Sequence, residues 1–226
     1  MASVVLRDIT VRYPSSAAPA LSGLDLRAEN GEFVVIEGSV RSGKSTVLRV
    51  VAGQETPASG NVLIGGVDVT GLSPQDRDAV LVFQNYALYP HMSVQDNMSF
   101  ALRVAGVSEA ERLDRVREAA RLLDLEDHLQ RSPAELSGPQ RQQVALARAV
   151  VRRPAVLLMD DPLASLPQDL KDPTAELIRT LARTLSVTTL YATSRPGPVA
   201  TVADRLLRLD SGRLVEDTAD TEIGTH

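Results

Sequence analysis

The stretch that decides the fold covers residues 31–53 and reads "GEFVVIEGSVRSGKSTVLRVVAG". It opens with an apolar run, Phe33 to Ile36, which predicts a buried strand. It closes with a segment that predicts a helix ending at Gly53. Between them, Gly38 and Gly43 allow the backbone to curl so that several N–H groups point inward. A strand, a glycine-containing turn and a helix in this order predict a site for an anion at the start of the helix.

The spacing of the turn is G-x-x-x-x-G-K-[ST], the pattern of a nucleotide phosphate-binding loop. Its lysine, Lys44, would reach the β- and γ-phosphates, and the Ser45 hydroxyl would ligate Mg²⁺. A chance glycine-rich turn is the alternative, but the flanking strand and helix favour nucleotide binding. The candidate nucleotide-binding residues here are Gly38, Ser39, Val40, Arg41, Ser42, Gly43, Lys44, Ser45 and Thr46.

A second acidic site follows the uninterrupted apolar segment "AVLLM", which predicts a buried strand of a parallel sheet. That strand ends in Asp160 and Asp161. Asp160 would hold Mg²⁺ through water, and Asp161 would polarise the attacking water. A solvated pair that merely caps a strand is the alternative for these two residues taken alone.

Strands and helices alternate along the chain, which predicts an α/β fold with a parallel sheet. "GNVLIGGVDV" predicts a hairpin that turns at Gly65–Gly66, and Ser108 with Glu111 predicts a capping box at a helix start. A helix is expected from about Pro139 to Arg152. We expect a single domain over 1–226, with a core lobe formed by about 1–84 and 154–226 and a helical subdomain at about 85–153.

Composition excludes several classes of protein. The chain has 226 residues, 43% of them hydrophobic, which is enough for a sizeable core. Its net charge of −5 argues against nucleic acid as a partner. There is no cysteine, so disulfides and thiolate metal sites are excluded. No apolar run approaches the ~20 residues of a membrane-spanning helix, and the N-terminal stretch does not predict a signal peptide.

Several motifs in order resemble those of the ATP-binding subunits of ABC transporters, most closely the sugar-importer type. They include "VRYP", the phosphate loop, "LVFQNYALYPHMSVQDNMSF", "LSGPQRQQVALARAVVRRPAVLLMDDPL" and "ADRLLRLDSGRLVE". The resemblance implies a P-loop NTPase (RecA-like) core with an N-terminal antiparallel β subdomain and an inserted α-helical subdomain. It also implies ATP and Mg²⁺ as ligands and a cytoplasmic location on the inner face of the membrane.

The resemblance also implies roles for individual residues. Tyr13 would stack on adenine, and Gln84 would couple the γ-phosphate and Mg²⁺ to the helical subdomain. Residues 85–97 would form the groove for a transmembrane permease subunit. A second ATP-binding subunit, identical or homologous, would complete the site with its signature residues, here Ser137, Gly138 and Gln140.

Simpler interpretations of three of these features stay open. Tyr13 could be an ordinary aromatic residue of an edge strand, and Gln84 could only cap a strand. The loop "NYALYPHM" could pack on its own helices, and His91 and His128 are expected at the surface.

The chain departs from the family pattern at four positions near the chemistry. Pro139 replaces a signature glycine and removes one N–H donor. Asp161 replaces the catalytic glutamate and is one methylene shorter. Ser194 replaces the switch histidine and is too short to reach a γ-phosphate, and Pro167 replaces an aspartate of the loop after the acidic strand. Further prolines at 173, 196 and 198 are expected to kink or delay helices. The catalytic candidates are Asp161, Gln84 and Ser194. Because the departures lie near the chemistry, we expect slow hydrolysis.

Two other functions stay open at this point. One is a regulatory partner subunit that binds ATP without hydrolysing it. The other is a soluble ABC protein of DNA repair or translation, which the acidic charge and the lack of a coiled-coil insert disfavour. Sugar-importer subunits commonly carry a further β-rich regulatory domain. Either this subunit is of a shorter kind or the resemblance to the sugar class is only local, so the transported substrate stays open as well.

Overall fold

The computed structural model describes residues 2–14, 16–83, 88–164 and 166–218. The strands of the chain are β1 (Val4–Val11), β2 (Leu21–Ala28), β3 (Phe33–Glu37), β4 (Ser59–Ile64), β5 (Val67–Asp68), β6 (Ala79–Val82), β7 (Val156–Asp160), β8 (Thr188–Thr193), β9 (Arg205–Asp210) and β10 (Arg213–Asp217). The α-helices are α1 (Lys44–Val51), α2 (Val94–Val104), α3 (Glu109–Leu122), α4 (Gly138–Val150), α5 (Gln168–Thr184) and α6 (Gly197–Val202). Short 3-10 turns lie at Pro74–Asp76, Glu126–His128 and Pro133–Glu135.

A six-stranded sheet forms the centre of the molecule, with the strand order β10-β9-β3-β8-β7-β6. All its pairs are parallel except β9 with β10. The register sets Glu37 opposite Thr193 and Asp160 opposite Ala192. The carboxyl ends of β3, β7 and β8 therefore meet at one edge, the place where ligands bind in open α/β sheets.

The N-terminal strands form a separate four-stranded sheet with the order β2-β1-β4-β5 and antiparallel pairs. Its β4–β5 hairpin turns at Gly65 and Gly66, which both have positive φ. The hairpin predicted for this segment is confirmed. A two-residue turn with positive φ at both positions matches the twist of the flanking strands.

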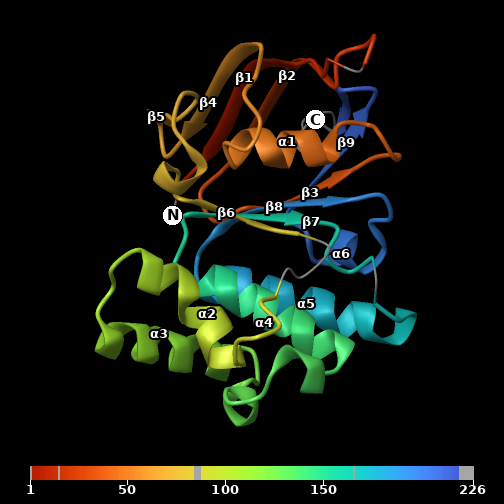
Figure 1. Cartoon of the computed structure of the whole chain (residues 1–226). Coiled ribbons are helices and arrows are strands. Elements are labelled where there is room, and N and C mark those ends of the chain that lie inside the picture. Colours follow the sequence, from red (N-terminus) through yellow and green to blue (C-terminus); the bar gives the residue numbers. More distant parts are fainter. Residues whose placement is uncertain (1, 15, 84–87, 165, 219–226) are drawn as a thin grey trace.

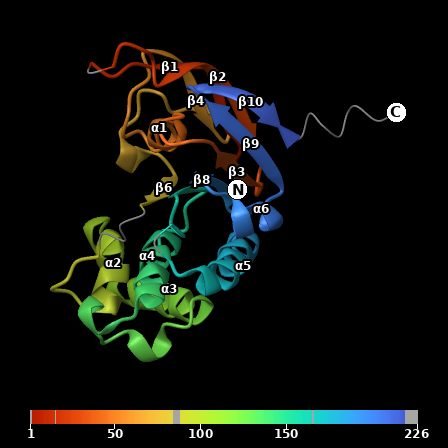
Figure 2. The same cartoon turned by 90° about the vertical axis from the view of Figure 1, so that its right-hand side faces the viewer.

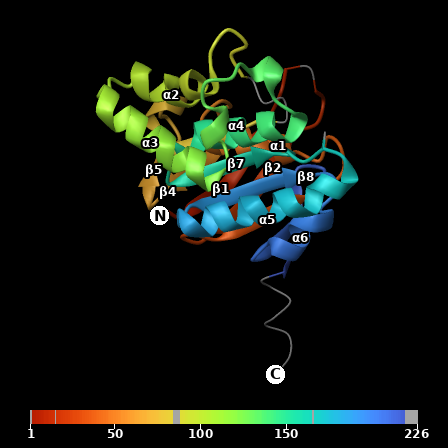
Figure 3. The same ribbon diagram turned by 90° about the horizontal axis from the view of Figure 1, so that it is seen from below.

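The elements stack in layers (Figure 1). Helix α1 lies between the antiparallel sheet and the six-stranded sheet, and α2 to α5 lie on the other side of the six-stranded sheet (Figures 1 and 2). Seen from below, α5 and α6 cover the β8 side while α2 and α3 lie farther out beside α4 (Figure 3). This arrangement is the P-loop NTPase α/β fold expected from the sequence, and none of the described helices is long and apolar enough to span a membrane.

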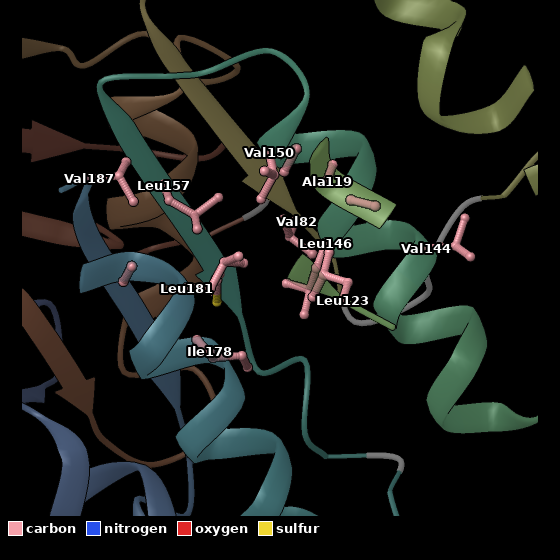
Figure 4. Packing of buried hydrophobic residues seen from close by; sticks show 14 of the residues in the cluster. Val82, Ala119, Leu123, Val144, Leu146, Val150, Leu157, Ile178, Leu181 and Val187 are labelled. Carbon is pink, nitrogen blue, oxygen red and sulfur yellow. The ribbon is translucent and has the colours of Figure 1, made fainter. Parts of the chain in front are cut away.

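Two hydrophobic cores hold these layers together. One fills the space around α1 between the two sheets. The other lies between the six-stranded sheet and the helices below it. There Leu157 of β7 and Val187, just before β8, lie over Ile178 and Leu181 of α5, with Leu146 of α4 beside them (Figure 4). These two cores bury β7 and β8 on both faces. This burial explains the continuous apolar run of β7.

Some local predictions were wrong in detail. Ser108 caps α3 by accepting from the Glu111 N–H, but the Glu111 carboxylate pairs with Arg115 instead of closing the box. Helix α5 continues through Pro173, which lies six residues into it. Helix α6 is indeed short and begins only at Gly197.

Candidate functional site

The phosphate loop connects β3 to α1, and its lysine is bonded to the loop itself. Lys44 Nζ donates to the carbonyl oxygens of Gly38 and Ser39, both at 2.7 Å, and to Ser42 Oγ at 3.3 Å. Gly43 precedes the helix with φ at 105°, a conformation that only glycine adopts easily. Burial lowers the pKa of the Lys44 ammonium, while the Asp161 and Asp160 carboxylates act in the opposite direction. The Lys44 side chain is thus held at the start of α1 by its bonds to the loop.

Ser45 and Asp160, two of the three residues predicted at the Mg²⁺ site, lie in direct contact, while the third, Gln84, lies outside the described residues. Ser45 Oγ donates to Asp160 Oδ1 at 2.9 Å, across 115 residues of sequence. Both ligands offer oxygen atoms, which Mg²⁺ prefers, and Mg²⁺ keeps most of its other positions for phosphate oxygens and water. The donor set therefore fits Mg²⁺.

A cavity of about 470 Å³ lies over the phosphate loop. It is lined by Arg41 to Thr46 on one side and by Tyr13 on the other. The Tyr13 hydroxyl is 3.3 Å from Thr46 Oγ1, so the half-buried ring is tied to the first turn of α1. Tyr13 follows the end of β1 rather than lying within the strand, which leaves its ring beside the space where a nucleotide base could lie.

Asp161 lies one residue beyond β7, with φ at 46°, in the left-handed region. Thr193 Oγ1 donates to its Oδ1 at 3.0 Å, and the backbone N–H and hydroxyl of Ser194 lie 3.5 Å from its Oδ2. The carboxylate is therefore held by the end of β8. Ser194, predicted as a catalytic candidate at the position of the family's histidine, is a neighbour of Asp161.

The signature residues begin α4, on the far side of the sheet from α1. Ser137 Oγ accepts from the Gln140 N–H at 3.3 Å, and Gln140 Oε1 accepts from the Ser137 N–H at 2.9 Å, which makes a capping box. The helix begins at Gly138, so Pro139 is its second residue and not its first as predicted. A proline is tolerated there too, because the first N–H groups of a helix have no partner within it.

Gln84 and residues 85–87 lie outside the described residues, so the roles predicted for Gln84 are not addressed. The described part of the predicted groove is organised by Asn97, which is buried. Its side chain accepts from the Tyr89 N–H at 2.8 Å and donates to the carbonyl oxygens of Tyr89, Met92 and Ser93. The Arg148 guanidinium lies 4.8 Å from the centre of the Tyr89 ring. The described part of the loop, residues 88–92, thus packs against α2 and α4.

Sequence reasoning missed three features of the site. Arg41, a bulky residue between two glycines of the phosphate loop, has φ at 69°, which is a strained conformation for a non-glycine residue. Its place in a tight glycine-containing turn is the sequence signal that could have indicated this strain. Thr193 holds Asp161, and nothing in the local pattern marks it. His128, expected at the surface, is half-buried, and its Nε2 lies 2.8 Å from Gln140 Nε2.

Comparison with known proteins agrees with this geometry. Residues 21–164 match the family model described as ABC transporter. The chain belongs to this family. Within the family it is similar to the diacetylchitobiose uptake system ATP-binding protein MsiK of Streptomyces coelicolor, with 50% identity over 95% of this chain and 57% of MsiK. It is also similar to the sn-glycerol-3-phosphate import ATP-binding protein UgpC of Chromobacterium violaceum, with 45% identity over 99% of this chain and 60% of UgpC.

The solved structures similar to this ABC family chain include dimers. The ATP-binding cassette MJ0796, solved as a dimer in a post-hydrolysis state bound to ADP and Pi, superimposes with a TM-score of 0.81 and 28% identity. The match covers 95% of this chain and 97% of that one. The curated relatives are longer, and the chain spans between 57% and 61% of their length.

Proposed function

We propose that the chain is the ATP-binding part of an ABC importer, which binds Mg·ATP at the phosphate loop and transmits dimer closure to membrane subunits. The observation that carries the proposal is the contact of Ser45 with Asp160 beneath a cavity lined by the phosphate loop and Tyr13. The names of the similar proteins, which describe uptake and import, support the transport part. The cargo is left open.

ATP binding would use groups that are already in place. The three donors of Lys44 now bond the loop, and a β- or γ-phosphate would replace carbonyl acceptors with charged ones, which form stronger hydrogen bonds. Ser45 and Asp160 would hold Mg²⁺, which when bound neutralises negative charge on the phosphates. Tyr13 would cover the base, and Gln84 would face the γ-phosphate side.

We expect slow hydrolysis because the groups that would act on water are occupied or short. The Asp161 carboxylate accepts from Thr193 and is approached by Ser194, so it is held toward β8. At the signature, Pro139 has no N–H, and the Ser137 and Gln140 N–H groups are bonded within the capping box. Within the described structure this leaves the Gly138 N–H as the helix-start donor for a partner's nucleotide.

Two surfaces would meet other subunits in this proposal. Residues 85–97 would receive a permease segment. The phosphate loop and the signature would each face a second ATP-binding subunit in a head-to-tail dimer. The dimeric state of the similar cassette MJ0796 supports this arrangement. We propose that 1–226 act as one domain, with the helices of about 85–153 as its partner-facing part, and that it works on the cytoplasmic side of the membrane.

The test compares the natural chain with a triple variant, Pro139→Gly, Asp161→Glu and Ser194→His. ATP affinity is measured by titration calorimetry and turnover by phosphate release in Mg·ATP. We expect equal ATP affinity and a turnover that rises by about 10²–10⁴-fold, since a well-placed general base contributes that much. A matched variant, Ser211→His at the rim of the nucleotide cavity, adds a histidine away from Asp161 and should not raise turnover.

The result also separates the alternatives. A natural chain that turns over as fast as the triple variant would contradict slow hydrolysis and describe an ordinary transport ATPase. A chain with no turnover at all would be a regulatory partner subunit. Failure to bind ATP in either form would overturn the proposal.

A further inference from the structure

A second cavity, of about 290 Å³, lies at the same edge of the sheet between the ends of β7 and β8 and helices α5 and α6. Asp161, Thr193 and Ser194 form one side of it, and Lys171 and Arg195 contribute to its lining. It shares no lining residue with the cavity over the phosphate loop. The two cavities therefore have separate linings.

The charges around this second cavity are not balanced. Neither the Lys171 ammonium nor the Arg195 guanidinium forms an ion pair with any described residue. Asp161, the acidic group of the lining, is engaged by Thr193 and Ser194 instead. Two unpaired cations that line one hollow favour an anionic ligand.

An unpartnered buried hydroxyl points to the same ligand. Tyr191 lines the cavity and is only 1% exposed, yet its hydroxyl forms no hydrogen bond of normal geometry with the described residues. Burial raises the pKa of this hydroxyl and the Asp161 charge raises it further, with a smaller opposite effect from the Leu163 backbone, so it stays protonated and can donate. A buried polar group without a partner is destabilising, and a hydrogen bond to a ligand oxygen would remove that cost.

We propose that this cavity binds inorganic phosphate in its protonated form. Lys171, Arg195 and the Tyr191 hydroxyl would donate to its oxygens, while its own O–H would donate to the Asp161 carboxylate. A carboxylate has lone pairs for more than the bonds that Asp161 accepts now. Sulfate has the same shape and charge but carries no proton near neutral pH, so it would face the carboxylate without a hydrogen bond. The inference does not depend on ATP hydrolysis, because the ligand is phosphate itself.

The test uses the two lysines of the chain, Lys44 and Lys171. The chain is prepared with ¹³C-labelled lysine Cε, which gives one NMR signal in each cavity, and Lys171→Arg assigns them. The phosphate loop is first saturated with ADP, and sodium phosphate or sodium sulfate is then added at constant ionic strength. We expect the Lys171 signal to shift saturably, with phosphate binding at least tenfold more tightly than sulfate, and the Lys44 signal to stay fixed.

Three variants test the individual contacts. Tyr191→Phe removes a hydroxyl that has no partner in the described structure, so it should fold and should weaken phosphate binding by about tenfold. Tyr13→Phe makes the same change in the other cavity and should leave the Lys171 titration unchanged. Asp161→Asn supplies an N–H donor in place of the carboxylate and should abolish the preference for phosphate over sulfate. Arg195→Gln, at an exposed position, should weaken the binding of both phosphate and sulfate.

Each opposite result overturns the proposal. A Lys171 signal that does not move, or that moves equally with phosphate and sulfate, shows no phosphate site in the second cavity. A shift confined to Lys44 places phosphate at the phosphate loop alone. Equal phosphate affinity in the natural chain and the Tyr191→Phe variant shows that the hydroxyl is not part of a site.

Discussion

Two regions meet at the carboxyl edge of the central sheet, and they differ in what their side chains do. The phosphate loop after β3 holds Lys44 and Ser45 ready for a charged ligand, with their bonds made to the loop and to Asp160. The corner formed by the ends of β7 and β8 instead uses Asp161 to join two strand ends through Thr193. The carboxylate next to the phosphate loop thus belongs to a site that is open to a nucleotide, whereas the Asp161 carboxylate of the corner is committed to the protein.

The difference shows that binding and turnover can be separated within a single sheet edge. A ligand at the phosphate loop would replace neutral partners of Lys44 with charged ones, so the loop gains from binding. At the corner, any movement of Asp161 toward a water would break its bond with Thr193. A chain can therefore keep a well-formed nucleotide site while its general base loses mobility.

The largest expected difference between the phosphate loop and the corner is in ATP affinity, and Lys44→Ala tests it. The change removes donors to the phosphates, and two lost charge-assisted hydrogen bonds should weaken ATP binding by at least about 100-fold. The measurement is calorimetric titration with Mg·ATP. Lys171→Ala, at the corner, is the matched control and should leave ATP affinity within about twofold. An equal loss in both variants would show that the two cavities act as one nucleotide site.

An intermediate effect is expected from Thr193→Val at the corner. Thr193 is 2% exposed, and besides donating to Asp161 it accepts from the Arg195 N–H at 3.1 Å. Removing the hydroxyl should lower the free energy of unfolding by about 1–2 kcal/mol, because the Asp161 carboxylate and the Arg195 N–H each lose a partly buried partner. Urea denaturation followed by circular dichroism measures this.

Thr189→Val is the control for that change, in the same strand. Thr189 is fully buried, and among the described residues its hydroxyl bonds only the nearby Val187 carbonyl, at 3.3 Å. We expect Thr189→Val to lower the free energy of unfolding by about 0.5 kcal/mol or less. If both variants lose the same stability, Thr193 has no special part in holding Asp161.

The smallest effect concerns strain in the phosphate loop. Arg41 has φ at 69°, and this conformation costs a non-glycine residue about 1–2 kcal/mol in the folded state. Glycine avoids that strain, but its more flexible unfolded chain lowers the free energy of unfolding by about 0.4–1 kcal/mol. Arg41→Gly should therefore raise the free energy of unfolding by about 0.5 kcal/mol. Val40→Gly, at a neighbouring residue that is 81% exposed and has no positive φ, should lower it by a similar amount. Urea denaturation compares the two, and changes of the same sign would contradict the strain argument.

Much of the nucleotide site was predictable because its signals are local in the sequence. Lys44, Ser45 and the two glycines follow one spacing rule, and the apolar strand before Asp160 marks its position at a sheet edge. The contacts of the corner were not predictable in this way. Thr193 and Tyr191 lie in the buried strand β8, and only the tertiary structure shows that Thr193 holds Asp161 while Tyr191 lines a cavity with a hydroxyl that has no described partner.

The sequence by itself determined the family, the order of strands and helices, and the residues that can meet a phosphate, because these depend on the spacing of residue types along a few turns of chain. Only the tertiary structure decided which of those groups are free. Ser45 meets Asp160 across 115 residues and Thr193 meets Asp161 across 32, and such contacts depend on strand order and on the face each side chain takes. The same packing separates the phosphate loop from the corner cavity, because Asp160 and Asp161, adjacent in sequence, engage different neighbours.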